Sequence, residues 1–234
     1  VFSGAVQNRD LVGGLQGSAA SSDSYAPGPK GVAFRGARVT SGGVNFGNVQ
    51  PITGDTWTVL VLANPSASAN PQALFSQRKG TANYGQIDLA INSTSGLVGA
   101  SGLLTAITIE EAAGSASRYA ESSASTYADG GWHLYGMTRA GVGTFPSLYF
   151  DGAAISATTG GTSTGSSIST AMHTRIGNIA DYTVDGAYAA QCDIAFVAVW
   201  NRVLSAREIA NVYANPWIVF EPITERKTFG PAAS

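Results

Sequence analysis

The segment 178–186 contains the residue types that come nearest to a metal site in this sequence. Asp181 and Asp185 stand four residues apart with backbone carbonyls between them, and Asp193 follows the segment. Calcium takes its oxygen ligands from carboxylates, carbonyls and water, so these three aspartates are the candidate calcium ligands. The alternative is a polar turn, because Asp185-Gly186 is a common turn pair, with Asp193 bonded to backbone. The expected cofactor is calcium or none.

The same segment carries groups that suit a sugar. Tyr182 and Tyr188 flank its acidic part, and Asn178 and Asp181 lie near them in the sequence. Aromatic faces pack against the C–H surfaces of sugars, while planar polar groups orient the hydroxyls. These four residues are therefore the candidate glycan-binding residues. The alternative is that both tyrosines serve packing alone.

A glycosidase of a β-sandwich needs two carboxylates on the same face of one strand, and the sequence has no such pair. The six glutamates include none that stands two residues from another acid in a strand, and Glu110-Glu111 point to opposite faces of a strand end that we expect to be solvated. The serine motif at 161–165 lacks the strand and helix that flank a nucleophile elbow. We expect His133 to be a packed or surface histidine, Cys192 to be an inert core thiol, and the protein to have no enzymatic activity.

Composition excludes several other classes of function. Of the 234 residues only 12% are charged and the net charge is −2, so the chain has no basic surface for nucleic acid. A single cysteine forms no internal disulfide. No apolar run approaches the roughly 18 residues of a membrane span, so we expect no membrane insertion. The chain begins at Val1 rather than Met, and we expect a segment upstream of it.

The elements that must position these residues are short strands between turn signals. Asp151-Gly152 is the strongest hairpin signal, because both residues accept the backbone angles of a tight turn. The pattern predicts an all-β antiparallel sandwich over residues 1–220, as one domain, followed by a tail or arm at 221–234. The predicted strands are 31–40, 55–63, 84–92, 103–109, 131–139, 147–150, 153–157, 172–176 and 192–200.

One short C-terminal helix is predicted over 206–214. Ser205 fits the N-cap and Glu208 stands three residues later, which is the spacing of a capping box. Asn215-Pro216 ends the helix, because the residue before proline avoids the helical region. The predicted apolar face consists of Ile209, Val212 and Tyr213.

Four segments together resemble laminin-G-like jelly rolls. Residues 131–139 and 146–155 resemble the G-x-W-H and L-Y-x-D-G core, and 175–178 is similar to the R-I-G strand. Residues 192–209 resemble the family's ending, except that Ala195 stands where that pattern has an acid. The resemblance implies a concanavalin-like β-sandwich (jelly roll), and relatives of this kind often hold one calcium ion.

The two ends of the chain resemble a narrower group. Residues 8–12 and 213–222 are similar to jelly-roll proteins encoded by tailed bacteriophages and prophages. This resemblance implies a head decoration, head fibre or tail component on the virion surface, with other virion proteins or further copies of itself as partners. Trp217 and Phe220 are the candidate assembly residues, and Trp217 could equally dock the tail onto its own sandwich.

Three hypotheses of function follow. The favoured one is a non-enzymatic bacteriophage virion structural or decoration protein, with host-surface glycans as its expected ligands. The second is a carbohydrate-binding module of a secreted bacterial protein. A glycan-active enzyme is the least favoured. Because one fold hosts many functions, the choice depends on the site rather than on the sandwich.

Overall fold

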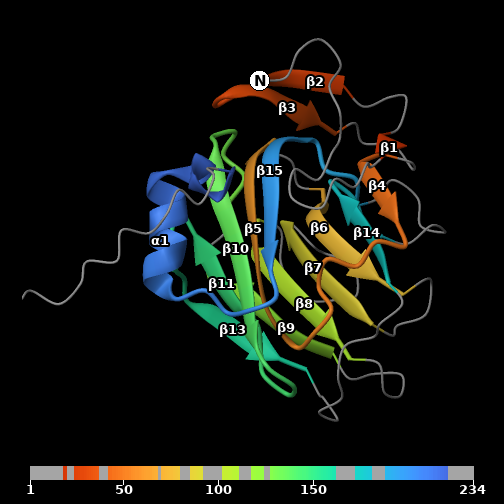
Figure 1. Ribbon diagram of the computed structural model, residues 1–234, viewed down its shortest axis with the longest axis vertical. Helices are drawn as coiled ribbons and strands as arrows, with labels where there is room; N and C mark the ends of the chain where they lie inside the picture. Colours follow the sequence, from red (N-terminus) through yellow and green to blue (C-terminus); the bar gives the residue numbers. More distant parts are fainter. Residues whose placement is uncertain are drawn as a thin grey trace, which may run out of the picture.

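The protein is a sandwich of two antiparallel sheets in a computed structural model (Figure 1). The structure describes residues 18–19, 24–36, 42–67, 70–79, 85–91, 102–110, 117–123, 127–161, 172–180 and 188–220. The two sheets and one α-helix confirm the predicted fold class. Within these ranges no helix is long and apolar enough to cross a membrane. The domain bounds 1–220 and the tail 221–234 stay predictions.

The first sheet has eight strands. Its spatial order is β1 (Ser18–Ala19), β4 (Val44–Gly47), β14 (His173–Ile176), β6 (Gln72–Arg78), β7 (Gln86–Ile91), β8 (Leu104–Ile109), β9 (Ser117–Ser122) and β13 (Ala157–Gly160). The sequence did not predict β1, β4, β6, β9 or β13, and the predicted strand 153–157 meets β13 only at Ala157.

The second sheet has seven strands. Its spatial order is β12 (Ala153–Ala154), β11 (Ser147–Phe150), β10 (His133–Ala140), β5 (Thr56–Pro65), β15 (Cys192–Trp200), β3 (Gly31–Arg35) and β2 (Ser24–Gly28). Here only β2 was not predicted; its Pro27 and Gly28 are residues that usually weaken a strand.

The main hydrophobic core lies between the two sheets. On β5, Trp57, Val59 and Val61 point into this core, while Leu60 and Leu62 point to the opposite face and join a second apolar cluster. This explains why β5 is apolar on both faces. Cys192 is buried in the core, and burial raises the pKa of its thiol, as expected for an inert cysteine.

Helix α1 (Ala206–Ala214) covers the outer face of the seven-stranded sheet, alongside β10 and β11 (Figure 1). The predicted capping box is present: the Glu208 N–H donates to Ser205 Oγ, and the Ser205 N–H donates to the Glu208 carboxylate. The predicted apolar face is wrong at Tyr213, which is 46% exposed. A 3₁₀ helix, η2 (Pro216–Phe220), follows and was not predicted.

The hairpin at Asp151-Gly152 joins two parts of the laminin-G-like motif. Both residues have positive φ, +49° and +81°, as a two-residue hairpin turn requires. The Asp151 carboxylate accepts the Leu134 N–H at 3.0 Å and contacts His133 Nδ1 at 2.7 Å. His133 also stacks on Phe150, with ring centroids 4.6 Å apart. Its packing role is therefore confirmed.

The other ring nitrogen of the same histidine faces a second acid. His133 Nε2 lies 3.1 Å from Asp129 Oδ1, which also accepts the Gly131 N–H at 2.7 Å. The Gly131 N–H, followed by the His133 contact, lowers the pKa of the Asp129 carboxyl. These contacts fasten the loop before β10 to the hairpin.

We predict that Gly152→Ala destabilises the fold by about 1–3 kcal/mol. A methyl group at this position would lie 2.8 Å from Tyr213 Cβ and 3.2 Å from Ala210 Cα, in a left-handed backbone conformation. Equilibrium unfolding in urea measures the loss. The control is Gly54→Ala, because a Cβ at Gly54 meets nothing within 4 Å. Equal stability of the two variants would contradict the close approach of α1 to the hairpin.

Candidate functional site

A polar cluster lies on the outer face of the eight-stranded sheet. Ser76 on β6 and Asp88 on β7 are paired across the two strands, and their neighbours Phe75 and Leu89 point into the core between the sheets. Side chains alternate along a strand, so Ser76 and Asp88 point away from that core. Together with Arg78 and Gln86, which share their face, they are called the Asp88 cluster here.

The buried Asp88 carboxylate organises this cluster. Asp88 Oδ1 accepts the Ser76 hydroxyl at 2.6 Å, and Oδ2 accepts Arg78 Nε at 3.0 Å. Arg78 Nη2 and Gln86 Nε2 also donate to Oδ2. The side chain of Asp88 is 3% exposed and that of Arg78 is 13% exposed. The buried Asp88 carboxylate therefore fixes the Arg78 guanidinium, and part of the arginine side chain reaches the surface.

This arrangement suits recognition of an uncharged polar ligand. The charge of Arg78 is balanced by Asp88, and an arginine held by two of its nitrogens presents its remaining donors in a defined plane. Hydroxyl and carbonyl oxygens are the natural acceptors for such donors. A few well-oriented polar groups of this kind define the ligand orientation in binding sites.

The segment after β14 connects this cluster to the sequence-predicted site. The Ala180 N–H donates to Ser76 Oγ at 2.8 Å. Asn178 is buried, and its amide donates to the Gly42 carbonyl at 2.9 Å and accepts the Ile179 N–H at 2.8 Å. Asn178 therefore holds the turn in place. The candidate residues Asp181, Tyr182 and Asp185 lie outside the described residues, and their glycan and calcium roles stay predictions.

Asp193 and Tyr188 lie in or beside the seven-stranded sheet. Asp193 on β15 forms a two-point ion pair with Arg35 on β3, at 2.6 and 2.8 Å, and this pair raises the pKa of Arg35. Tyr188 is half-buried just before β15. In the described ranges no three His, Cys, Asp or Glu residues lie together as a metal site. The calcium site stays a prediction.

The candidate assembly residues pack within their own chain. In η2 the rings of Trp217 and Phe220 lie against Phe196 on β15, with centroids 5.8 and 5.5 Å away. Lys30 Nζ lies 5.9 Å from the centroid of the Trp217 ring. Ile218 between them is exposed. The two aromatic residues thus help dock the chain end onto the sandwich, and their role in assembly stays a prediction.

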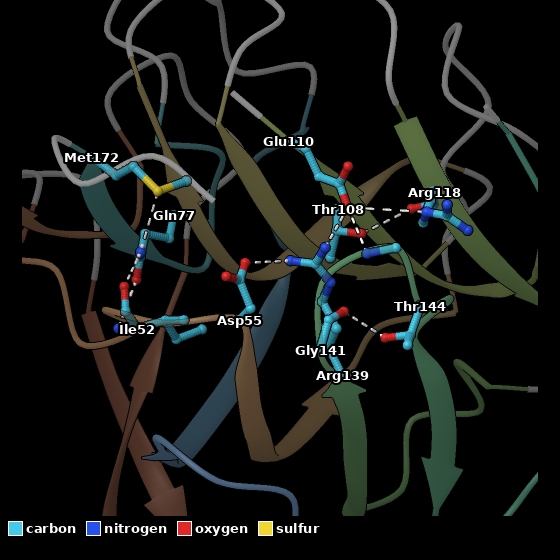
Figure 2. A network of polar contacts seen from close by, with 11 residues as sticks. Ile52, Asp55, Gln77, Thr108, Glu110, Arg118, Arg139, Gly141, Thr144 and Met172 are labelled. Atoms are coloured by element: carbon cyan, nitrogen blue, oxygen red, sulfur yellow. Dashed lines mark hydrogen bonds and ion pairs between the residues drawn. The ribbon is translucent and has the colours of Figure 1, made fainter. Parts of the chain in front are cut away.

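A buried charge network ties the two sheets together at one end (Figure 2). Arg139 on β10 donates through Nη2 to Glu110, which directly follows β8, and through Nη1 to Asp55 at 3.2 Å. Glu110 also accepts the Gly143 N–H at 3.2 Å and lies 4.0 Å from Arg118 Nε. Arg139 and Glu110 are fully buried, so the predicted solvated strand end is wrong for Glu110.

The charges of this network balance one another, which indicates a role in stability. Burial lowers the pKa of Arg139, whereas Glu110 and Asp55 act in the opposite direction and favour its charged form. A guanidinium keeps its proton in proteins, so the buried charges balance. Asp55 and Glu110 both bond to one arginine, which is unlike the free acid and nucleophile of a glycosidase.

The two packed sheets, with a polar cluster on one outer face and a helix on the other, define a lectin-like β-sandwich. The family model of the concanavalin A-like lectin/glucanases superfamily matches residues 38–210. The chain therefore belongs to this superfamily, which confirms the laminin-G-like resemblance. No curated protein sequence matches this one.

Solved structures show the same fold at low identity. The binding domain of Paraclostridial Mosquitocidal Protein 1 has a TM-score of 0.59 at 13% identity, covering 88% of this chain and 48% of that domain. The Botulinum Neurotoxin serotype G binding domain has a TM-score of 0.57 at 13% identity, covering 89% and 48%. This chain therefore spans about half the length of each toxin domain.

A third solved structure is covered almost completely. It is the CBM40 carbohydrate-binding module of the Ruminococcus gnavus IT-sialidase, bound to α2,3-sialyllactose. The TM-score is 0.52 at 14% identity, with 76% of this chain and 96% of that module covered. At these identities the likeness establishes the fold.

We predict that Glu110→Gln destabilises the protein by about 3 kcal/mol, because it leaves the buried Arg139 with a single acid. The double variant Glu110→Leu/Arg139→Met removes both charges and should lose less than the single variant. Urea denaturation measures both. Arg202→Gln is the control, since the Arg202–Glu208 pair is exposed and its loss should change stability little. If the double variant is the least stable, the charge-balance argument fails.

Proposed function

We propose that this protein is a non-enzymatic glycan-binding module whose ligand lies over the outer face of the eight-stranded sheet. The observation that carries the proposal is the Asp88 cluster, where a buried carboxylate holds a partly exposed arginine in a defined plane. Binding through a group that is already ordered loses less conformational entropy than binding through a mobile arginine.

The relatives of known structure support this proposal. Two are toxin binding domains and one is a carbohydrate-binding module bound to an oligosaccharide. The opposite outer face, on the seven-stranded sheet, is occupied by α1 and η2, whose apolar residues pack against β5, β10 and β15. On the eight-stranded sheet the outward side chains Asp88 and Ile107 are buried as well, and Arg78 is the member of the Asp88 cluster that reaches the surface, so Arg78 is the proposed ligand contact.

The non-enzymatic part of the proposal is supported by three of the described acids. Asp55, Glu110 and Asp88 are each bonded to an arginine within the chain. An acid that must donate or accept protons during hydrolysis needs a raised pKa or a free position beside the scissile bond. Bonding to a guanidinium works against both.

We further propose that the module is displayed on a bacteriophage virion surface, as a decoration, head fibre or tail component. Support comes from the resemblance of residues 8–12 and 213–222 to phage jelly rolls and from a chain with only 12% charged residues. The partners would be other virion proteins or further copies of itself. Tyr213 on α1 and Ile218 on η2 are exposed and offer apolar surface for such contacts. A secreted carbohydrate-binding protein is the alternative.

We predict that Arg78→Lys weakens glycan binding at least about tenfold. Lysine keeps the positive charge that Asp88 needs, so the variant should fold, but it loses the planar donor pair. Binding is measured on a printed array of bacterial surface oligosaccharides and then by titration calorimetry with the tightest array ligand. Thermal unfolding checks that the variant is folded.

Arg35→Lys is the matched control for this experiment. Arg35 also forms a two-point pair with an aspartate on a neighbouring strand, but on the seven-stranded sheet. Its affinity for the same ligand should equal that of the wild type. Equal effects of the two variants, or no array ligand for the wild type, would refute glycan binding at the Asp88 cluster.

We predict that purified phage particles from a lysate of the encoding strain contain this chain in fixed ratio to the major capsid protein. Quantitative mass spectrometry of gradient-purified particles measures the ratio. Recovery of the chain only in the soluble fraction, with none in the particles, would reject virion display and favour the secreted alternative.

A further inference from the structure

We propose that His133 is a pH-dependent clasp, which fastens the loop 129–131 to the sandwich when its imidazole ring is protonated and releases the loop when the ring is neutral. The observation behind the proposal is that both ring nitrogens lie at hydrogen-bond distance from a carboxylate, and the two carboxylates belong to different segments of the chain. The clasp is built into the fold and is independent of the ligand proposed above.

The His133 ring lies between two acids of unequal exposure. On one side Nδ1 lies 2.7 Å from Asp151 Oδ2, in the turn between β11 and β12, and the Asp151 side chain is 24% exposed. On the other side Nε2 lies 3.1 Å from Asp129 Oδ1, in the loop before β10, and the Asp129 side chain is 58% exposed. The ring therefore joins a solvent-exposed loop to a partly buried turn.

Only the protonated ring suits both contacts. An imidazolium carries an N–H on each nitrogen and donates to both carboxylates, whereas a neutral imidazole has one N–H and a lone pair on the other nitrogen. That lone pair is repelled by a carboxylate oxygen, which has no proton to donate. Histidine side chains change between these two forms from about pH 5 to 8. One of the two contacts is therefore lost as the pH rises through this range.

The proton belongs to the ring rather than to the acid in the loop. The Gly131 N–H, which donates to Asp129 Oδ1 at 2.7 Å, and then the His133 contact lower the pKa of the Asp129 carboxyl. A carboxyl with a lowered pKa stays ionised near neutral pH. The Asp129 oxygen therefore remains an acceptor when the ring becomes neutral.

The other titratable groups near the ring stay neutral. Tyr135 contacts His133 edge-on, and its hydroxyl donates to the Tyr127 carbonyl. Burial raises the pKa of this hydroxyl, and the charges of Asp129, Cys192 and Asp151 act in the same direction. Burial also raises the pKa of the Cys192 thiol. Among the described groups around the ring, His133 is therefore the one whose charge changes near neutral pH.

The contact with Asp129 is the one that opens. Asp151 is fixed by further bonds, because its Oδ1 accepts the Leu134 N–H at 3.0 Å and its own N–H donates to the Leu134 carbonyl at 2.9 Å. In the described part of the chain Asp129 bonds only to the Gly131 N–H, two residues away, and to the ring. Without the ring contact, Asp129 is joined only to its own loop.

The release is confined to the loop 129–131. Before the loop, Tyr127 is buried in the core and its carbonyl accepts the Tyr135 hydroxyl. After the loop, β10 pairs with β5 from His133 onward. Both ends of the loop therefore stay in place when the clasp opens.

The test is amide exchange measured by NMR on the full chain at about pH 5.5 and about pH 8, which bracket most of the titration range of imidazole. Each rate is divided by the intrinsic exchange rate at that pH. The Gly131 amide reports the Asp129 contact and the Leu134 amide reports Asp151. Protection of Gly131 should fall about tenfold at the higher pH, as expected for the loss of one hydrogen bond to a charged group, while protection of Leu134 stays constant. Equal protection of Gly131 at both pH values would overturn the proposal.

Two variants and a control assign the effect to one ring. His133→Gln removes the titrating group, and Asp129→Asn removes the charge of the loop acid at an exposed position. Each should make the protection of Gly131 independent of pH. His173→Gln is the matched control, because His173 is the other of the two histidines and lies on β14 in the opposite sheet. If His133→Gln does not fold, Asp129→Asn decides the matter. A pH response that persists in Asp129→Asn or disappears in His173→Gln contradicts the clasp.

The ring gives an independent readout. Long-range ¹H–¹⁵N spectra identify which nitrogen of a neutral imidazole carries the proton. Because Asp151 keeps its contact, neutral His133 should carry its proton on Nδ1. A neutral ring with its proton on Nε2 would still donate to Asp129, and this result would overturn the release of the loop.

Discussion

Each strand of this sandwich can place only every second side chain between the sheets, and that constraint organises the rest of the molecule. β5 meets it with Trp57, Val59 and Val61 inward and Leu60 and Leu62 outward. The outward leucines need an apolar cover, which α1 and η2 provide. The eight-stranded sheet instead turns Ser76 and Asp88 outward. The two outer faces thus differ in chemistry because the strands differ at alternate positions.

A charge that is buried away from water needs a nearby opposite charge, because an unpaired buried charge costs a large free energy. The structure meets this requirement twice with an arginine and an acid. Arg139 and Glu110 lie between the sheets and are fully buried, so their contact joins β10 to the end of β8. Arg78 and Asp88 lie on an outer face, and there the arginine retains some contact with solvent. The Arg139–Glu110 pair therefore joins the two sheets, whereas the Arg78–Asp88 pair leaves hydrogen-bond donors of the arginine near the surface.

The parts of the fold that the sequence predicted depend on local rules. The capping box at Ser205 and Glu208 and the turn at Asp151-Gly152 are decided within a few residues. β6 escaped prediction because its pairing with β7 shifts between Ala73 and Phe75, so Leu74 and Phe75 both enter the core and the alternation is broken. The burial of Glu110 depends on Arg139, which is 29 residues away in the other sheet. No local pattern contains that partner.

The candidate site shows the same division. Scanning a single segment for acids and aromatic residues selects the stretch that begins at Asn178. In the structure Asn178 bonds to the Gly42 carbonyl, and the Ala180 N–H bonds to Ser76 on β6. The Asp88 cluster comes from two strands, where Ser76 and Arg78 meet Gln86 and Asp88 at alternate positions. Polar residues spaced by two were the available signal, but Ser76 and Arg78 stood in no predicted strand, and only the cross-strand register joins them to Gln86 and Asp88 in one site. The same register places Thr105 opposite Glu121, so the polar chemistry of this face is set by the pairing of β6, β7, β8 and β9 and is not contained in any single segment.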